Sequence, residues 1–280
     1  MKKESFITRL SELPKDEDFM QTQEKLYSIE GWFSPASHAL FSFFLDYQNE
    51  NKINGNLGEI GVWHGKSATI ICKKVKENQN IFLIDPFLLN VKEIVLRNID
   101  KVCLEIPKNL VLMNGISDDF VKISNFTQLH KSFRFFHIDG CHTGTNIYRD
   151  LSLADKLISS DGIVVIDDYF NLSYPQITEA LYKFCQLNPY SFRIFCVGFN
   201  KAYLCRPESF SKYYSLTTSS MQESLFTKGI YVTIKKTSSL GDSFSISVEL
   251  YNQQTDPLSG KRGPDWDEDT FETVKMISER

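Results

Sequence analysis

Short, continuous apolar runs recur along the first two thirds of the chain. They lie at residues 57–62, 81–84, 110–113, 133–138 and 162–166. A continuous rather than alternating apolar character is typical of strands that are buried on both faces, as in a parallel sheet. Helix-like segments separate these runs, and this alternation predicts an α/β fold with a mostly parallel sheet and helices on both of its faces.

The predicted helices follow from apolar side chains at helical spacing. Three of them fall at residues 68–75, 146–159 and 176–184. Ser34 followed by Pro35 predicts the start of another helix, rich in aromatic residues, because Ser is a good N-cap and Pro suits the first helical position.

The later part of the chain predicts antiparallel strands. Residues 192–197 and 202–205 flank a short Gly-containing turn and predict a β-hairpin at the C-terminal end of the sheet. Two further stretches, 230–234 and 244–248, alternate between apolar and polar residues and predict a second antiparallel pair.

These patterns divide the chain into three parts. Residues 1–30 form a polar segment with weak helical periodicity, and residues 31–206 form the main α/β domain. Residues 207–280 form a β-rich appendage, which includes a polar tail at 253–268.

Composition excludes several classes of function. The 31 basic and 35 acidic residues of this 280-residue chain give a net charge of −4, so there is no overall electrostatic reason to bind nucleic acid. No apolar stretch approaches the roughly 20 residues of a membrane span, and no leader is evident, so we expect no membrane partner and a cytoplasmic location. The six cysteines form no C-x-x-C pair, which indicates reduced thiols rather than a zinc site.

The turn after the first apolar run reads E-x-G-x-x-x-G-x-S, from Glu59 through Gly61 and Gly65 to Ser67. A Walker A loop would need glycine at Ile60, and a dinucleotide fingerprint would need it two and five residues after Gly61, so neither phosphate-binding motif is present. The two glycines would let the backbone turn tightly against a ligand, and Glu59 could accept hydrogen bonds from an ammonium group.

Asp85 ends the second apolar run, 24 residues after Gly61. A carboxylate in that place can accept both hydrogen bonds of a ribose diol. Phe87 follows closely, and we expect its ring to lie against an adenine.

Carboxylates also end the fourth and fifth runs. Asp139 follows the fourth run, and Asp167 and Asp168 follow the fifth. Carboxyl ends of neighbouring parallel strands meet at one sheet edge, where three carboxylates would repel one another unless a cation joins them. Mg²⁺ prefers such oxygen ligands, and it would lower the pKa of a substrate hydroxyl. His142 is a candidate general base, whereas His137 lies within a strand and is expected to be a core residue.

Taken together, residues 31–206 resemble a class I S-adenosylmethionine-dependent methyltransferase, and the two-glycine loop followed by Ser67 resembles the macrocin-type small-molecule O-methyltransferases. The resemblance implies a Rossmann-like sheet, with Glu59, Gly61, Gly65, Ser67, Asp85, Phe87 and Ser117 around the cofactor. Catechol-type relatives carry a metal-binding Asp and an Asp pair where Asp139, Asp167 and Asp168 stand. They have a basic Lys in the place of His142. Macrocin-type relatives read Asp-Gly-Asp-His there, with Cys141 replacing the second acid in this chain.

Three hypotheses stay open from the sequence. The first is a Mg²⁺-dependent O-methyltransferase that acts on a hydroxyl of a sugar or polyketide-like natural product. The second is a methyltransferase that needs no metal, with His142 as base. The third is a non-catalytic binding module with the same fold. The β-rich appendage is equally compatible with a lid or with a contact in a homo-oligomer.

Overall fold

The computed structural model describes residues 13–123, 125–237 and 245–251. The polar tail predicted at 253–268 lies outside these residues, as does Phe244 of the last predicted strand. Among the described residues, no helix has the length and apolar character needed to cross a membrane.

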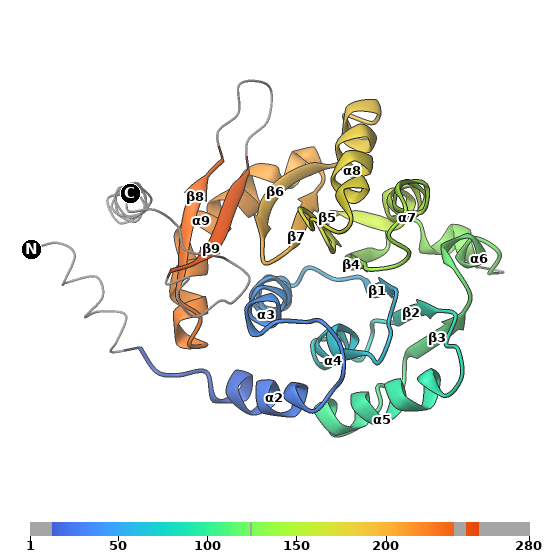
Figure 1. Cartoon of the computed structure of the whole chain (residues 1–280), viewed down its shortest axis with the longest axis horizontal. Helices are drawn as coiled ribbons and strands as arrows, with labels where there is room; N and C mark the ends of the chain where they lie inside the picture. Colours follow the sequence, from blue (N-terminus) through green and yellow to red (C-terminus); the bar gives the residue numbers. More distant parts are fainter. Residues whose placement is uncertain (1–12, 124, 238–244, 252–280) are drawn as a thin grey trace, which may run out of the picture.

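Nine strands of the described chain form one sheet, in the order β3-β2-β1-β4-β5-β7-β6-β9-β8 (Figure 1). The strands are β1 (Asn56–Ile60), β2 (Ile81–Asp85), β3 (Leu110–Asn114), β4 (Phe133–Ile138), β5 (Ile158–Ile166), β6 (Arg193–Gly198), β7 (Lys201–Cys205), β8 (Val232–Lys236) and β9 (Ile246–Leu250). Strands β1 to β5 pair in parallel, and β7 pairs antiparallel with both β5 and β6. The predicted parallel sheet with a C-terminal hairpin is therefore confirmed.

Helices cover both faces of this sheet. They are α2 (Glu17–Tyr27), α3 (Pro35–Glu50), α4 (Lys66–Lys73), α5 (Val91–Cys103), α6 (Ser117–Phe120), α7 (Gly144–Leu157), α8 (Pro175–Leu187) and α9 (Phe210–Thr227), with short 3₁₀ turns η1 (Phe126–Leu129) and η2 (Pro207–Ser209). One apolar core lies between the sheet and α2, α3, α4, α5 and α9, and a second lies between the sheet and α6, α7 and α8 (Figure 1). This double cover explains why the central strands are apolar throughout.

The start of α3 is as the sequence predicts. Ser34 is the N-cap, and its side chain accepts a hydrogen bond of 3.0 Å from the Ser37 N–H, while Pro35 takes the first helical position. The helix is buried along most of its length, so its aromatic residues contribute to the core.

The appendage contains one element that the sequence did not reveal. The predicted strands form as β8 and β9 and pair antiparallel, but helix α9 precedes them. Its buried side chains include Tyr213, Thr217, Met221 and Leu225, a four-residue spacing that Ser and Thr at the intervening positions had obscured.

The appendage is joined to the main sheet. Strand β9 pairs in parallel with β6, with Cys196 opposite Ile246, so the two added strands extend the sheet at its edge (Figure 1). The division of the chain into separate domains stays a prediction.

Candidate active site

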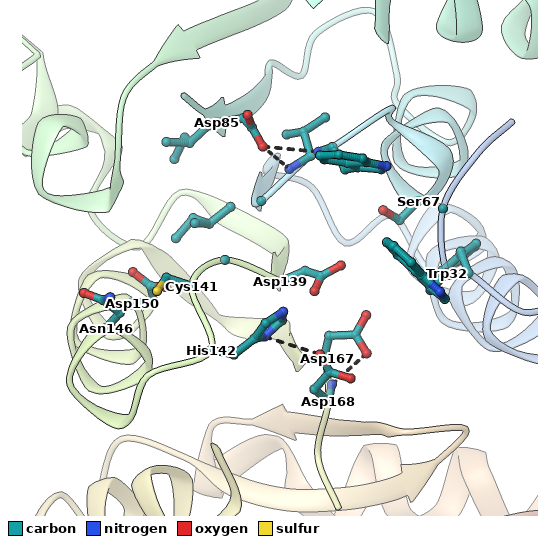
Figure 2. A pocket seen from close by; sticks show the side chains of 18 of the residues that line it. Trp32, Ser67, Asp85, Asp139, Cys141, His142, Asn146, Asp150, Asp167 and Asp168 are labelled. Carbon is teal, nitrogen blue, oxygen red and sulfur yellow. Dashed lines mark hydrogen bonds and ion pairs between the residues drawn. The ribbon is translucent and has the colours of Figure 1, made fainter. Parts of the chain in front are cut away.

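A cavity of about 1210 Å³ opens at the carboxyl ends of the parallel strands. This is where ligands bind in open α/β sheets. Figure 2 shows carboxylates and His142 pointing into this space from several different strands. The predicted site residues that line the cavity are Gly61, Ser67, Asp85, Ser117, Asp139, His142, Asp167 and Asp168.

Gly61 sits where the first and fourth strands approach most closely. Its φ is +81°, and a Cβ atom there would lie 1.8 Å from the carbonyl oxygen of Asp139. No other residue fits this position without moving the backbone of β4. Gly65 also has a positive φ, of +80°, and forms the N-cap of α4. The two glycines thus allow a tight loop at the cavity wall, as predicted.

Asp85 binds the same loop. One carboxylate oxygen accepts hydrogen bonds from the backbone N–H groups of Val62 (2.8 Å) and Trp63 (3.2 Å; Figure 2). The other oxygen accepts one from the Phe87 N–H (2.7 Å). A carboxylate has about four acceptor positions, so roughly one remains for a ligand hydroxyl. Asp85 therefore shapes the loop as well as facing the cavity.

Three predicted cofactor residues do not line the cavity: Glu59, Gly65 and Phe87. Phe87 is buried in the core. Glu59 is fully buried, and its Oε1 accepts hydrogen bonds from Ser67 Oγ and from His137 Nδ1, each at 2.6 Å. Its Oε2 has no hydrogen-bond partner among the described residues. The structure thus places Glu59 where it positions Ser67.

Ser117 lies at the rim near the end of β3 and contacts a buried carboxyl group. It donates a hydrogen bond to Asp150 of α7, which also lines the cavity (Figure 2). Burial raises the pKa of Asp150 to about 6, although the Ser117 hydrogen bond opposes this. Nothing in the sequence pattern singles out Asp150, because it lies within a helix.

The predicted acidic cluster forms, but it contains its own cation. The Lys201 ammonium bonds to Oδ2 of Asp167, and both side chains are buried, with 2% and 7% of their surface exposed. His137 Nε2 lies 3.6 Å from the same oxygen. Although burial opposes it, Lys201 and His137 hold the pKa of Asp167 below its usual range.

This ion pair affects the pKa values of two neighbouring groups, Asp139 and His137. Burial and the Asp167 carboxylate raise the pKa of Asp139 well above its usual range, against the opposing charges of His137 and Lys201. For His137, burial would lower the pKa, but Asp167 and Glu59 raise it to about 9. The two carboxylates therefore favour the protonated form of His137, an effect that the sequence-based expectation of a core histidine did not include.

His142 and Asp168 form a second pair that faces the cavity. His142 Nδ1 lies 3.3 Å from Asp168 Oδ2, and the imidazole stacks on Tyr174 with ring centroids 4.2 Å apart (Figure 2). Asp168 is itself held by 2.6 Å hydrogen bonds from the side-chain amides of Asn171 and Asn200. A carboxylate held in this way fixes the imidazole orientation, as in other bases oriented by a third group.

Two groups of side chains bring ligand atoms within 4.8 Å of one another. One consists of His137, Asp139 and Asp167, and the other of Asp139, His142 and Asp168. In the first group Asp167 already has the Lys201 ammonium as its partner. In the second group, neither Asp139 nor Asp168 has an ammonium partner among the described residues, although Asp168 accepts hydrogen bonds from two amides. On this ground of charge, the second group fits a divalent cation better.

Comparison with known proteins identifies the domain around this cavity. Residues 59–169 match the sequence model of a family described as a methyltransferase domain. Of the site residues described in this subsection, only Lys201, Asn171, Tyr174 and Asn200 lie outside this range. This part of the chain therefore resembles a methyltransferase domain. No curated protein matches its sequence.

Solved methyltransferase structures share the fold. The O-methyltransferase NovP is 16% identical, with 63% of this chain and 83% of that one covered and a TM-score of 0.51. The O-methyltransferase from Bacillus cereus in complex with SAH is 15% identical, with 70% and 93% covered and a TM-score of 0.50. At such identities the likeness establishes the fold alone.

The order of the strands accounts for the arrangement of the cavity. The glycine loop and Asp85 lie at the ends of β1 and β2. Asp139, His142 and Asp168 follow β4 and β5 on the other side of Gly61. Lys201, which the sequence did not reveal, starts β7 and reaches Asp167 only because β7 pairs antiparallel with β5.

Proposed function

We propose that this protein transfers the methyl group of S-adenosylmethionine to a hydroxyl group of a small molecule. The observation that carries the proposal is the His142–Asp168 pair, which lies in the same cavity as the glycine loop and Asp85. S-Adenosylmethionine supplies an electrophilic methyl group, and the protein must hold the acceptor oxygen in line with it and take up the hydroxyl proton.

In this proposal His142 accepts the proton. Asp168 orients the ring through Nδ1 and stabilises the imidazolium that forms, while Tyr174 limits tilting of the ring. His142 is one-third exposed, so it can reach a substrate in the cavity. Asn146, Arg149 and Trp32 also line the cavity. Amide, guanidinium and aromatic groups in one cavity suit a polyhydroxylated acceptor, such as a sugar or polyketide-like natural product.

A divalent cation such as Mg²⁺ belongs to the proposal as an accessory. Asp139 and Asp168 would hold it beside His142, and the cation would lower the pKa of the acceptor hydroxyl. Transfer without a metal is the second candidate, and the buried Lys201–Asp167 pair favours it because that pair already neutralises one carboxylate of the cluster.

The first test is calorimetric titration of S-adenosylmethionine into wild type, Asp85→Ala and Asp100→Ala, each with Mg²⁺ and with EDTA. Asp85→Ala should weaken binding about tenfold to hundredfold, because it removes charge-assisted hydrogen bonds to the loop and the ligand. Asp100→Ala, an exposed change on α5, should bind like wild type. Absence of binding by folded wild type would disprove the proposal.

The second test measures methyl transfer to a panel of hydroxylated acceptors. His142→Asn should lower kcat by about 10²- to 10⁴-fold with little change in S-adenosylmethionine affinity. His130→Asn, an exposed change beside η1, is the matched control and should retain activity. Loss of activity in EDTA, restored by Mg²⁺, would support the metal-assisted form, whereas full activity in EDTA would support the metal-free form.

A further inference from the structure

Lys201 is an unusual residue for the floor of a metal-binding cavity. Its side chain is 2% exposed, and its ammonium bonds directly to Asp167. Antiparallel pairing of Ile166 with Ala202 sets the two residues opposite each other at the ends of β5 and β7. The pair is therefore fixed by the register of the sheet rather than by a mobile loop.

The Asp167 carboxylate has its donors already. Oδ2 meets Lys201 and lies 3.6 Å from His137 Nε2, a buried atom that has no hydrogen-bond partner among the described residues. Oδ1 accepts a 2.7 Å hydrogen bond from the Asp168 N–H. A metal ion bound to this carboxylate would lie beside the Lys201 ammonium, and at a few ångströms in a buried site such repulsion is strong.

Asp139 and Asp168 line the same cavity as Asp167 but have no ammonium partner among the described residues. Asp139 has no hydrogen-bond donor for its carboxylate within the described part of the chain, and its oxygens lie within 4.8 Å of ligand atoms of His142 and Asp168. Asp139 and Asp168 both line the open cavity, where a cation can keep water ligands.

We propose that Lys201 is a built-in counter-cation of the acidic cluster, which holds Asp167 and leaves a divalent cation only the carboxylates of Asp139 and Asp168, beside His142. The ammonium thus sets the metal affinity of the cavity. It supplies a fixed positive charge next to the reaction site whether or not a metal binds. This inference rests on the proposed function for its biological role, but metal binding alone tests it.

The experiment measures Mn²⁺ binding to the full chain by calorimetry and by the electron paramagnetic resonance signal of free Mn²⁺. Lys201→Met should raise Mn²⁺ affinity by at least about tenfold, since an outer-shell partner of a metal site commonly changes affinity by that much. Lys201→Arg keeps the charge and should bind like wild type. Lys66→Met removes another ammonium from the cavity wall, one that bonds to the Gly31 carbonyl, and should also bind like wild type.

A second pair of variants keeps the test decisive if Lys201→Met does not fold. In the wild-type background, Asp139→Asn should lower Mn²⁺ affinity at least about tenfold, whereas Asp167→Asn should lower it clearly less, because Asp167 is not a ligand in this inference. Equal Mn²⁺ affinity in wild type and folded Lys201→Met would overturn the inference. So would a loss in Asp167→Asn as large as that in Asp139→Asn. Failure to bind S-adenosylmethionine, with these Mn²⁺ effects intact, would instead disprove only the proposed function.

Discussion

Among single residues of the cavity, Gly61 tolerates substitution least. The positive φ of Gly61 restricts which residues can adopt its backbone conformation. In addition, a Cβ atom at Gly61 would lie 1.8 Å from the Asp139 carbonyl oxygen, so the glycine loop and the acidic cluster are in direct contact. Gly229 has a similar φ of +74°, but nothing lies within 4 Å of its Cβ position.

This contrast gives a matched pair of substitutions. Gly229→Ala should lower the free energy of unfolding by only about 1–2 kcal/mol, which is the cost of placing an alanine at a positive φ. Gly61→Ala should lower it by at least about 3 kcal/mol, because the backbones of β1 and β4 must separate. Thermal or urea unfolding of both variants measures the difference, and equal losses would show that the close approach is not rigid.

Asp150 predicts a dependence of stability on pH. Its folded-state pKa of about 6 is above the ordinary value of 3.8, so folding disfavours the ionised form. Its contribution to stability is complete below pH 3.8 and is lost as the pH rises through 6. Asp150→Asn should therefore raise the free energy of unfolding at pH 8 by up to ~3 kcal/mol, and change it little at pH 3.5. Urea unfolding at the two pH values checks this, and an equal effect at both would contradict it.

Residues at the ends of strands were predictable from the sequence, whereas residues whose contacts depend on strand register or on a local turn were not. Gly61, Asp85, Asp139 and Asp168 follow strands directly, so the sheet edge on which they meet was predictable from the order of elements. Lys201 was missed because its contact with Asp167 depends on antiparallel register between strands that are distant in sequence. The buried position of Phe87 likewise depends on a local backbone turn, in which its φ is +43°. The residues around Phe87 in the sequence do not predict this turn.

At the level of elements, a buried arginine joins one helix to the sheet. Arg134 of β4 is fully buried and donates hydrogen bonds to the Gln48 side chain of α3 (2.9 Å) and to the Gln79 side chain (3.2 Å). It also donates to the Lys74 carbonyl after α4 (2.9 Å). Burial lowers its pKa to about 10. Arg134 thus fixes α3 and the end of α4 against the sheet.

Replacing this arginine should loosen that contact. Arg134→Met should reduce the free energy of unfolding by about 3 kcal/mol or more, since it leaves the two glutamines and a carbonyl without their partner. Arg97→Met, an exposed change on α5, should alter it by less than about 0.5 kcal/mol. Chemical denaturation of the two variants is the measurement, and similar small effects would show that water replaces the guanidinium.

Elements with strong periodicity were predictable, and those stabilised mainly by tertiary contacts were not. The central strands are apolar because helices cover both faces, and that cause is visible in the sequence. Helix α9 is rich in Ser and Thr, which favour helix ends and turns, and packing of one buried side chain per turn against the sheet stabilises it.

At the scale of the whole molecule, the seam between β6 and β9 joins the appendage to the methyltransferase sheet. Gly198 lies on this seam, where a Cβ would meet the Val248 carbonyl oxygen at 2.7 Å. The absence of a side chain at Gly198 therefore permits the parallel pairing of the two strands.

Gly198→Val should open this seam while the rest of the sheet stays folded. We expect faster proteolytic cleavage within residues 228–251, with little change in the far-UV spectrum of the remaining chain. Gly144→Ala is the control, because its Cβ would meet neighbours only at an ordinary 3.7 Å or more. Unchanged protease resistance in Gly198→Val would show that β8 and β9 are held by α9 rather than by β6.

The same seam has a consequence for how the chain is made. Strand β9 is the last described strand to leave the ribosome, yet β6, synthesised about 50 residues earlier, needs it as a neighbour. Until then β6 presents free N–H and C=O groups to any other nascent chain, and such edges invite aggregation. Synthesis that stops between β7 and β9 would therefore yield a polypeptide with a nearly complete catalytic cavity and an unprotected edge. Such a product would be a target for chaperones rather than a smaller working enzyme.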